Sequence, residues 1–419
     1  MKAEVSINYS GNCVRAPSSK SAVQRYVAGA LLTEGITKLS VASMCDDSLA
    51  ALSVAESLGA EVKTYPGSVT VRGGFRPVNK EINCGESGLA TRMFIPIAAL
   101  HDGEITITGR GSVMNRPVVM VEEPLLQLGV EVLSRNGYLP VKIKGPLKGG
   151  SVIADGSVSS QFITGLLMAL PVVENDSRIF VKKLVSKPYI DLTIKILEDF
   201  GVEVINESYQ IFYIKGKQKY KHGNFVAEGD WSGAAFLLVM GAIGGSVEVT
   251  GLNTSSVQAD KSVLEALRRA GASVKEDKDK ISVTGGNLKG FEFDITDCPD
   301  LAPPLAVLGL ACKGRSVLQG TERLVAKESN RAQTICHALN TIGANIKSHD
   351  NIIETEGVET LKGGEASSFN DHRIAMALMS ASLISESPVI INGIECINKS
   401  YPGFIEDFRK LGGNVRIFK

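Results

Sequence analysis

Apolar and polar positions along the chain follow a pattern that repeats. An apolar residue, a Gly, a small or apolar residue, a polar residue and Val or Ile stand in this order at 58–62, 128–132, 200–204, 270–274, 342–346 and 411–415. The copies follow one another at intervals of about 70 residues. Such regularity indicates internal duplication, with six copies of one structural unit.

Each copy predicts the same order of elements. The Gly ends an amphipathic helix, as at 118–129, and the alternation after it predicts a strand with a second strand close behind, as at 139–145. Upstream lie another strand, as at 103–109, and a longer apolar helix, as at 88–100 or 161–171. The unit therefore runs strand, helix, strand, helix, strand, strand, which is a mixed α/β (α+β) pattern.

The length of the repeat bears on the architecture. Solenoid repeats span about 20 to 50 residues, so a longer unit indicates packed globular modules. Three units per domain would give two similar domains, and a cleft between them is the expected binding site.

Composition narrows the class of protein. The chain has 419 residues, 44% of them hydrophobic, and equal numbers of basic and acidic residues, 45 each, so bulk charge does not favour nucleic-acid or membrane-surface binding. We find no signal-peptide pattern and no uninterrupted apolar run long enough to span a membrane, and we expect a cytoplasmic protein. The seven cysteines are scattered without a C-x-x-C spacing, so we expect free thiols and no zinc site.

Residues 16–26, APSSKSAVQRY, predict a helix start that carries Lys20 and Ser21, with Arg25 one turn further on. Free backbone N–H groups and the helix dipole favour an anion there, although an ordinary capped helix is the alternative. A nucleotide-binding P-loop is excluded, because Ser19 and Val14 stand where that motif needs glycines.

Three further stretches of the first half place polar residues where apolar elements begin or end. CGESGLATRM (84–93) carries Arg92 and is followed by Arg116; DGSVSSQF (155–162) holds Ser159, Ser160 and Gln161; LVSKPYIDLT (184–193) offers Ser186 and Tyr189. Helix capping explains one serine in such a stretch, but it does not require Gln161 as well.

The second half adds acidic and basic groups. Asp300 precedes an apolar helix, where it is either an N-cap or a site residue. Lys327 and Arg331 are separated by one helical turn and would repel each other unless an anion lay between them, and Glu328 stands beside them. NDHR (370–373) and Lys399 complete the set. So many basic residues in motif positions indicate substrates that carry several negative charges.

These motifs, in order, resemble those of the enolpyruvyl transferase family: SSKS, GESG, NRP, DGSVSSQF, VSKPYID, PDLAPPLA, KESNR, NDHRIAM and KSYP. The resemblance spans the whole chain and is nearest to the members that use shikimate 3-phosphate. It implies two domains, each of three βαβαββ units (an inside-out α/β barrel), comprising 18–228 and 1–17 with 229–419. It also implies an active site in the interdomain cleft, a monomer, and no metal or organic cofactor.

The resemblance implies transfer of the enolpyruvyl group of phosphoenolpyruvate to the 5-hydroxyl of shikimate 3-phosphate, a step of aromatic amino acid biosynthesis. Lys20, Asp300 and Glu328 are then the catalytic residues. The expected shikimate 3-phosphate contacts are Lys20, Ser21, Arg25, Ser159, Ser160, Gln161, Ser186, Tyr189, Asp300, Arg323 and Lys327. The expected phosphoenolpyruvate contacts are Lys20, Gly88, Arg116, Gln161, Lys327, Arg331, Arg373 and Lys399.

The chain departs from the family pattern at a few positions. Glu86 replaces a common Asn, and we expect Arg92 or Arg323 to compensate its charge. Leu89 and Met93 replace a common Thr and Pro, so we expect weaker inhibition by glyphosate, which in this family occupies the phosphoenolpyruvate site.

Two alternative functions also fit part of this pattern. One is a UDP-N-acetylglucosamine enolpyruvyl transferase, which shares the fold and chemistry. The other is a non-catalytic repeat protein that binds anionic sugars, which would not require Asp300 and Glu328.

Overall fold

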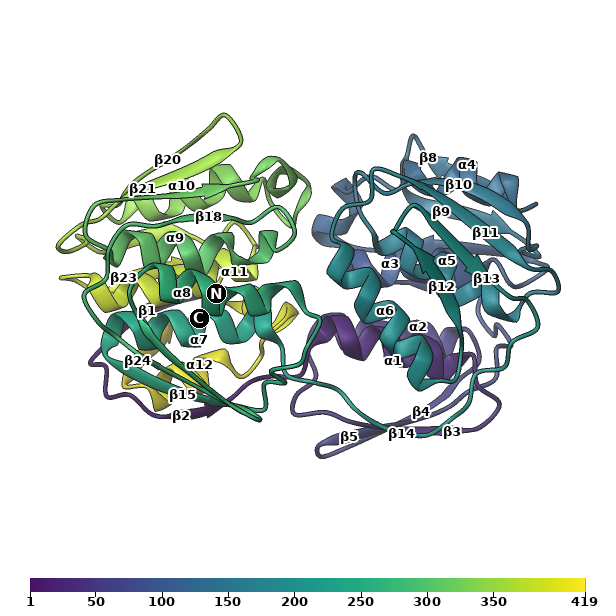
Figure 1. Cartoon of the computed structure of the whole chain (residues 1–419), viewed down its shortest axis with the longest axis horizontal. Helices are drawn as coiled ribbons and strands as arrows, with labels where there is room; N and C mark the ends of the chain where they lie inside the picture. The colour runs from purple at the N-terminus through teal and green to yellow at the C-terminus, as the bar shows by residue number, and fades with distance from the viewer. Residues whose placement is uncertain (419) are drawn as a thin grey trace. The chain divides into compact units, whose positions relative to one another are not determined.

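The computed structural model describes residues 1–418 and divides the chain into two compact units (Figure 1). One is built from two segments, Met1–Ser19 and the chain from Glu228 onward, and is called the split unit. The other, Lys20–Ala227, is the continuous unit.

The continuous unit contains three four-stranded sheets of one topology within the described residues. In each sheet the first two strands pair in parallel and the other pairs are antiparallel. In spatial order the sheets are β14 (Asn224–Val226), β3 (Ile36–Ser40), β5 (Ser68–Arg72), β4 (Glu61–Tyr65); β6 (Glu81–Asn83), β7 (Glu104–Thr108), β9 (Tyr138–Lys144), β8 (Glu131–Arg135); and β10 (Ser151–Asp155), β11 (Ser177–Lys182), β13 (Ile211–Ile214), β12 (Val204–Glu207).

The split unit repeats this topology in its three sheets. They are β2 (Cys13–Arg15), β15 (Ser246–Thr250), β17 (Lys280–Thr284), β16 (Ser273–Asp277); β18 (Glu292–Asp294), β19 (Arg315–Gln319), β21 (Ile352–Glu356), β20 (Asn345–His349); and β22 (Gly364–Ser367), β23 (Val389–Asn392), β1 (Lys2–Ile7), β24 (Gly413–Phe418). The N-terminal strand β1 completes the last sheet, where Val5 pairs with Val389 and Val415. The sixfold repetition confirms the predicted mixed α/β fold.

The first helix of every repeat is mostly apolar and lies in the interior. These helices are α1 (Lys20–Leu31), α3 (Gly88–Ala98), α5 (Gln161–Ala169), α7 (Trp231–Gly244), α9 (Ala302–Ala311) and α11 (His372–Ala381). Figure 1 shows that the sheets surround them within each unit. The second helices are α2 (Asp46–Ser57), α4 (Glu122–Gln127), α6 (Lys187–Asp199), α8 (Val263–Arg269), α10 (Arg331–Thr341) and α12 (Phe404–Lys410). Within residues 1–418 no helix has the length and apolar character needed to cross a membrane.

The repeated glycine takes the same conformation in all six copies. Its φ is positive everywhere, from +73° at Gly201 to +109° at Gly59, as expected where a helix ends and the chain turns into a strand. At Gly59 a Cβ atom would lie 2.4 Å from the carbonyl oxygen of Arg76. The sequence signature is therefore a turn that only glycine fits without strain.

The helix predicted at 118–129 is shorter than expected. The α-helix α4 begins at Glu122, and Val119–Val121 form a 3-10 turn before it. Pro124 has no N–H to donate to the carbonyl of Met120, so α-helical pairing cannot extend back across it. The proline is tolerated because it lies in the first turn of α4.

Gly165 allows two interior helices to approach each other closely. A Cβ atom at Gly165 of α5 would lie 2.5 Å from the backbone oxygen of Met93 of α3. We predict that Gly165→Ala lowers the free energy of unfolding by about 2 kcal/mol, because overpacking outweighs the better helix propensity of Ala. Urea unfolding measures this. Gly403→Ala is the control, since its added methyl group would meet only atoms at 3.9 Å; an equal effect of both substitutions would contradict the prediction.

Candidate active site

The starts of the three interior helices of the split unit lie together. Arg373, at the start of α11, donates from Nη1 to the carbonyl of Ser232 in α7 at 3.5 Å. Its Nη2 donates to Asp300 Oδ2, just ahead of α9, at 3.3 Å. These contacts define the split-unit cluster, which consists of Ser232, Asp260, Asp300, Lys327, Glu328, Arg331, Asp371 and Arg373.

Asp300 is an anion between Lys327 and Arg331, but the expected one-turn spacing of these cations on one helix is wrong, because Lys327 has extended backbone after the 3-10 turn Glu322–Ala326 and Arg331 is the first residue of α10. Its Oδ1 accepts from Lys327 Nζ at 3.1 Å and from Arg331 Nη1 at 2.7 Å. Asp300 lies in the 3-10 turn Pro299–Leu301, and α9 is preceded by Leu301 with no side-chain cap. The N-cap alternative for Asp300 is therefore wrong, and its carboxylate instead organises the basic residues.

Arg331 is fully buried and is held by carboxylates on several sides. Its Nε donates to Asp371 Oδ2 at 2.9 Å, and its Nη2 donates to Glu328. Asp371 also accepts from the backbone N–H of Arg373 and so caps α11. Asp371 belongs to the NDHR motif, and its place directly before an apolar helix is the sequence signal for this capping role.

The electrostatics of the cluster follow from burial and charge. Burial would raise the pKa of Asp300, but Arg373, Lys327 and Arg331 outweigh it and hold that pKa well below its usual value. Burial lowers the pKa of Lys327 to about 8, against the opposing pull of Asp300. Asp300 is thus a carboxylate at neutral pH, and Lys327 is closer to losing its proton there than an exposed lysine is.

A buried carboxylate that sequence reasoning missed completes this cluster. Asp260, in the 3-10 turn Ala259–Ser262, is 1% exposed, and its Oδ2 accepts from the hydroxyl of Ser232. Burial and the charge of Asp300 raise the pKa of Asp260 to about 6, while Arg373 opposes them. Its position in a loop, far from any motif, left no sequence signal.

The continuous unit has its own polar cluster at the starts of α1, α3 and α5. Lys20, the first residue of α1, pairs with Asp47 of α2 at 3.0 Å, and both side chains are mostly buried. Asp47 was not among the predicted residues, although two acids at the start of a helix were visible in CDDSLAAL. The pair holds the Lys20 ammonium near the helix start.

Arg25 is buried and organises its neighbours. Its guanidinium donates to Thr193 Oγ1 at 2.9 Å and to the carbonyls of Ser21 and Tyr189 at 2.8 and 3.2 Å. Burial lowers its pKa to about 10. Arg25 therefore fixes the backbone around Ser21 and Tyr189, two of the predicted substrate contacts.

The start of α3 brings two arginines into the cluster. Ser87 caps α3 through the N–H of Ala90 at 3.2 Å. A Cβ atom at Gly88 would lie 2.4 Å from Arg116 Nη1, so the close approach of that guanidinium requires glycine. Arg92 donates to Gln161 Oε1 at 2.8 Å, which joins α3 to the start of α5.

The predicted serines lie at the starts of α5 and α6. Ser159 Oγ accepts from the N–H of Gln161 at 3.2 Å, and Ser160 directly precedes α5. Ser186 precedes α6 with φ of 54°, a strained conformation for a residue other than glycine, and Tyr189 follows in the first turn. All four are thus placed at helix starts, as the motifs predicted.

The remaining predicted residues have these places. Glu86 lies in the loop between β6 and α3, where its carboxylate is 3.4 Å from the backbone nitrogen of Ser112. Arg323 of the split unit donates to the carbonyl of Thr296 at 3.1 Å. Lys399 ends the 3-10 turn Ile394–Lys399 and is nearly buried. For Glu86, the backbone N–H of Ser112 is therefore one partner that stabilises the negative charge.

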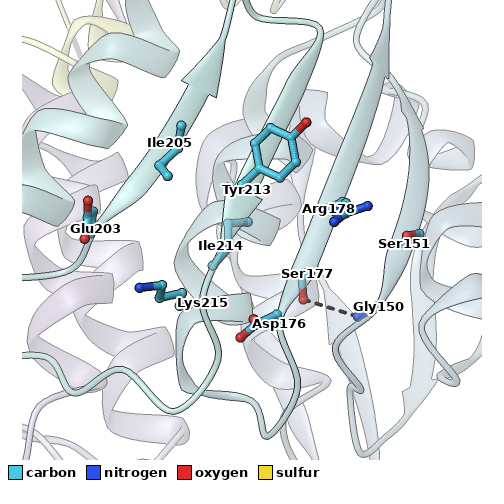
Figure 2. Close-up of a pocket in the computed structure, with 10 residues that line it drawn as sticks. All are labelled: Gly150, Ser151, Asp176, Ser177, Arg178, Glu203, Ile205, Tyr213, Ile214 and Lys215. Carbon is cyan, nitrogen blue, oxygen red and sulfur yellow. Dashed lines mark hydrogen bonds between the residues drawn. The ribbon is translucent and has the colours of Figure 1, made fainter.

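A separate surface groove of the continuous unit has a volume of about 430 Å³. Figure 2 shows it along the sheet of β10 to β13, with Arg178, Glu203, Ile205, Tyr213 and Lys215 around it. None of the predicted site residues lines it. This groove is not the candidate active site.

The chain is similar to a known family model and to known proteins over nearly its whole length. The family model for EPSP synthase (3-phosphoshikimate 1-carboxyvinyltransferase) matches residues 7–408. A 3-phosphoshikimate 1-carboxyvinyltransferase of Clostridium kluyveri is 39% identical over 405 residues, covering 96% of this chain and 95% of the relative. One from Clostridium perfringens is 39% identical over 408 residues, covering 96% of both chains.

A solved EPSP synthase structure from Acinetobacter baumannii matches with a TM-score of 0.84 and 25% identity, and covers both chains completely. The fold is that of an enolpyruvyl transferase. More specifically, the chain belongs to the EPSP synthase family, as its motifs predicted.

The raised pKa of Asp260 predicts a pH-dependent cost to stability. The ionised side chain is disfavoured in the fold, so the cost is complete above about pH 6 and disappears as pH falls towards the usual value of 3.8. We predict that Asp260→Asn raises the free energy of unfolding by about 2 kcal/mol near neutral pH and by much less near pH 4. Urea unfolding at both pH values measures this; a gain that is the same at both would contradict it.

Proposed function

We propose that this protein transfers the enolpyruvyl group of phosphoenolpyruvate to the 5-hydroxyl of shikimate 3-phosphate and releases phosphate. The observation that carries the proposal is Asp300 held at the helix starts by Lys327, Arg331 and Arg373. This arrangement places a carboxylate among cations that can bind phosphate and carboxylate groups. Both substrates carry such groups.

The proposed acceptor contacts begin with a set of neutral side chains of the continuous unit. Ser159, Ser160, Gln161, Ser186 and Tyr189 offer neutral hydrogen bonds and stand at two helix starts. We assign to them the shikimate 3-phosphate, together with Lys20, Ser21, Arg25, Asp300, Arg323 and Lys327. The neutral donors suit the ring hydroxyls, and the basic groups suit the phosphate and carboxylate.

The proposed phosphoenolpyruvate site is more strongly basic. It consists of Lys20, Gly88, Arg116, Gln161, Lys327, Arg331, Arg373 and Lys399. Gly88 supports this assignment, because its missing side chain allows Arg116 to lie against the backbone where a helix start also attracts anions.

The chemistry is an addition followed by an elimination. Glu328 donates a proton to the methylene carbon of phosphoenolpyruvate, the 5-hydroxyl oxygen bonds to the adjacent carbon, and Asp300 takes the hydroxyl proton. The methyl group of the tetrahedral intermediate then returns a proton to Glu328 as the bond to phosphate breaks, and Lys20 protonates the leaving group. Solvent then takes the proton from Asp300 and returns one to Lys20, so that both groups regain their starting states. The arginines stabilise the negative charge of the substrates throughout.

Substrate and solvent-exchange assays test this proposal. We predict phosphate release with shikimate 3-phosphate as acceptor and none with UDP-N-acetylglucosamine. Glu328→Gln and Asp300→Asn should each lower kcat by about 100-fold or more with the fold retained. In D₂O, Glu328→Gln should also stop deuterium incorporation into the methylene group. Exchange that persists in Glu328→Gln but is lost in Asp300→Asn would reverse the two roles, and release with the nucleotide sugar would refute the proposal.

The expected weak inhibition by glyphosate concerns the proposed phosphoenolpyruvate site. Leu89 and Met93 are buried on one face of α3, next to Gly88. We predict that the double change Leu89→Thr with Met93→Pro lowers the inhibition constant of glyphosate several-fold, because a smaller side chain relieves crowding at the Gly88 backbone. Leu89→Met keeps the bulk and is the control. Unaltered or weaker inhibition of the double variant would show that these positions are not the cause.

A further inference from the structure

Asp260 is a buried acid that the proposed chemistry does not use. It belongs to the split-unit cluster and lies on a turn that is hydrogen-bonded to the start of α7. Gln258 accepts from the backbone N–H of Trp231 at 3.2 Å and donates to the carbonyl of Gly229 at 2.8 Å. The position of the Asp260 carboxylate is therefore set by the fold rather than by solvent.

Ser232 connects Asp260 to the anion-binding groups. Its hydroxyl donates to Asp260, while its carbonyl accepts from Arg373 Nη1 at 3.5 Å. Arg373 in turn donates to Asp300 at 3.3 Å. Ser232 thus contacts both Asp260, through its hydroxyl, and Arg373, through its carbonyl.

We propose that Asp260 is a positioning residue whose negative charge weakens the hold of Arg373 on anionic substrates, and that protonation of Asp260 strengthens it. The proposal rests on the function proposed above, in which Arg373 binds phosphoenolpyruvate.

The physical reason for this effect is that the charges of Asp260 and Arg373 are both buried away from solvent. Asp260 is 1% exposed and Arg373 is 2% exposed, so solvent screens their interaction little. An ionised Asp260 offsets part of the positive potential that Arg373 presents to a ligand. A neutral Asp260 keeps its hydrogen bond to Ser232 and removes the offset.

The charged, titratable and hydrogen-bonding groups around Asp260 come from three elements. Asp230 and Ser232 belong to the start of α7, Cys298 and Asp300 to the turn before α9, and Arg373 to α11. Two of these are acids that oppose ionisation of Asp260, and one is a cation that favours it. The pKa of about 6 for Asp260 places its protonation just below neutral pH.

The test compares the KM for phosphoenolpyruvate between the natural protein and Asp260→Asn at about pH 7.5 and pH 5.5. Asn removes the charge but still accepts from Ser232. We expect a KM about three- to tenfold lower in Asp260→Asn at the higher pH, and nearly equal values at the lower pH. The ligand's own titration cancels, because both proteins meet the same ligand at each pH. Asp277→Asn, at an exposed strand end, is the matched control and should behave as the natural protein.

A second measurement does not depend on how well Asp260→Asn folds. Sulfate has the same charge across this range, and in the natural protein its competition with phosphoenolpyruvate should strengthen several-fold as pH falls from about 7.5 to 5.5. Ser232→Ala removes a donor that stabilises the charged form of Asp260, so the midpoint of this change should move to higher pH.

The outcomes separate the two proposals. Equal KM values for the natural protein and Asp260→Asn at both pH values, or a constant ratio between them, would overturn the role of Asp260 while leaving the proposed reaction intact. Absence of enolpyruvyl transfer by the natural protein would overturn the proposed function itself, and the role of Asp260 with it.

Discussion

The carboxylate of Asp300 is the interaction on which the split-unit cluster depends. Three basic side chains converge on it, and Arg331 among them is completely buried. Buried cations of this kind are costly unless a carboxylate compensates them within hydrogen-bonding distance. Asp300 and Asp371 supply that compensation, so the site can hold several positive charges ready for anionic ligands without unfolding around them.

The same logic operates in the continuous unit with different partners. Lys20 is paired with Asp47, Arg25 is held by hydroxyls and carbonyls, and Arg92 is held by the side-chain amide of Gln161. Neutral partners leave more of an arginine's charge available to a ligand than a carboxylate does. The two clusters therefore differ chemically: the cations of the split-unit cluster are paired mainly with carboxylates, whereas in the continuous unit Lys20 has an acidic partner but Arg25 and Arg92 are held by neutral groups.

The duplicated fold explains why these groups gather at all. In each repeat the first helix is buried and mostly apolar, and most of its polar side chains lie in its first two turns, where they can pair with other polar groups without disrupting the core. Three equivalent helices pack side by side in each unit and bring their starts together, as the contacts of Arg373 with Ser232 and Asp300 demonstrate. Catalytic motifs that are far apart in sequence become neighbours through repetition of one packing arrangement.

The sequence by itself determined the six-fold repeat, the order of elements and most of the candidate residues. These are local properties: glycine alone fits the positive φ that ends each helix, and apolar periodicity reports which face is buried. The sequence did not predict which residues far apart in the chain pair with each other. Neither Asp47 as the partner of Lys20 nor Asp260 behind Arg373 is marked by a motif, and the alternatives for Asp300 differed only in what lies around it. Tertiary structure decided these points, because the ionisation of a carboxylate depends on burial and on charges that folding brings within a few ångströms.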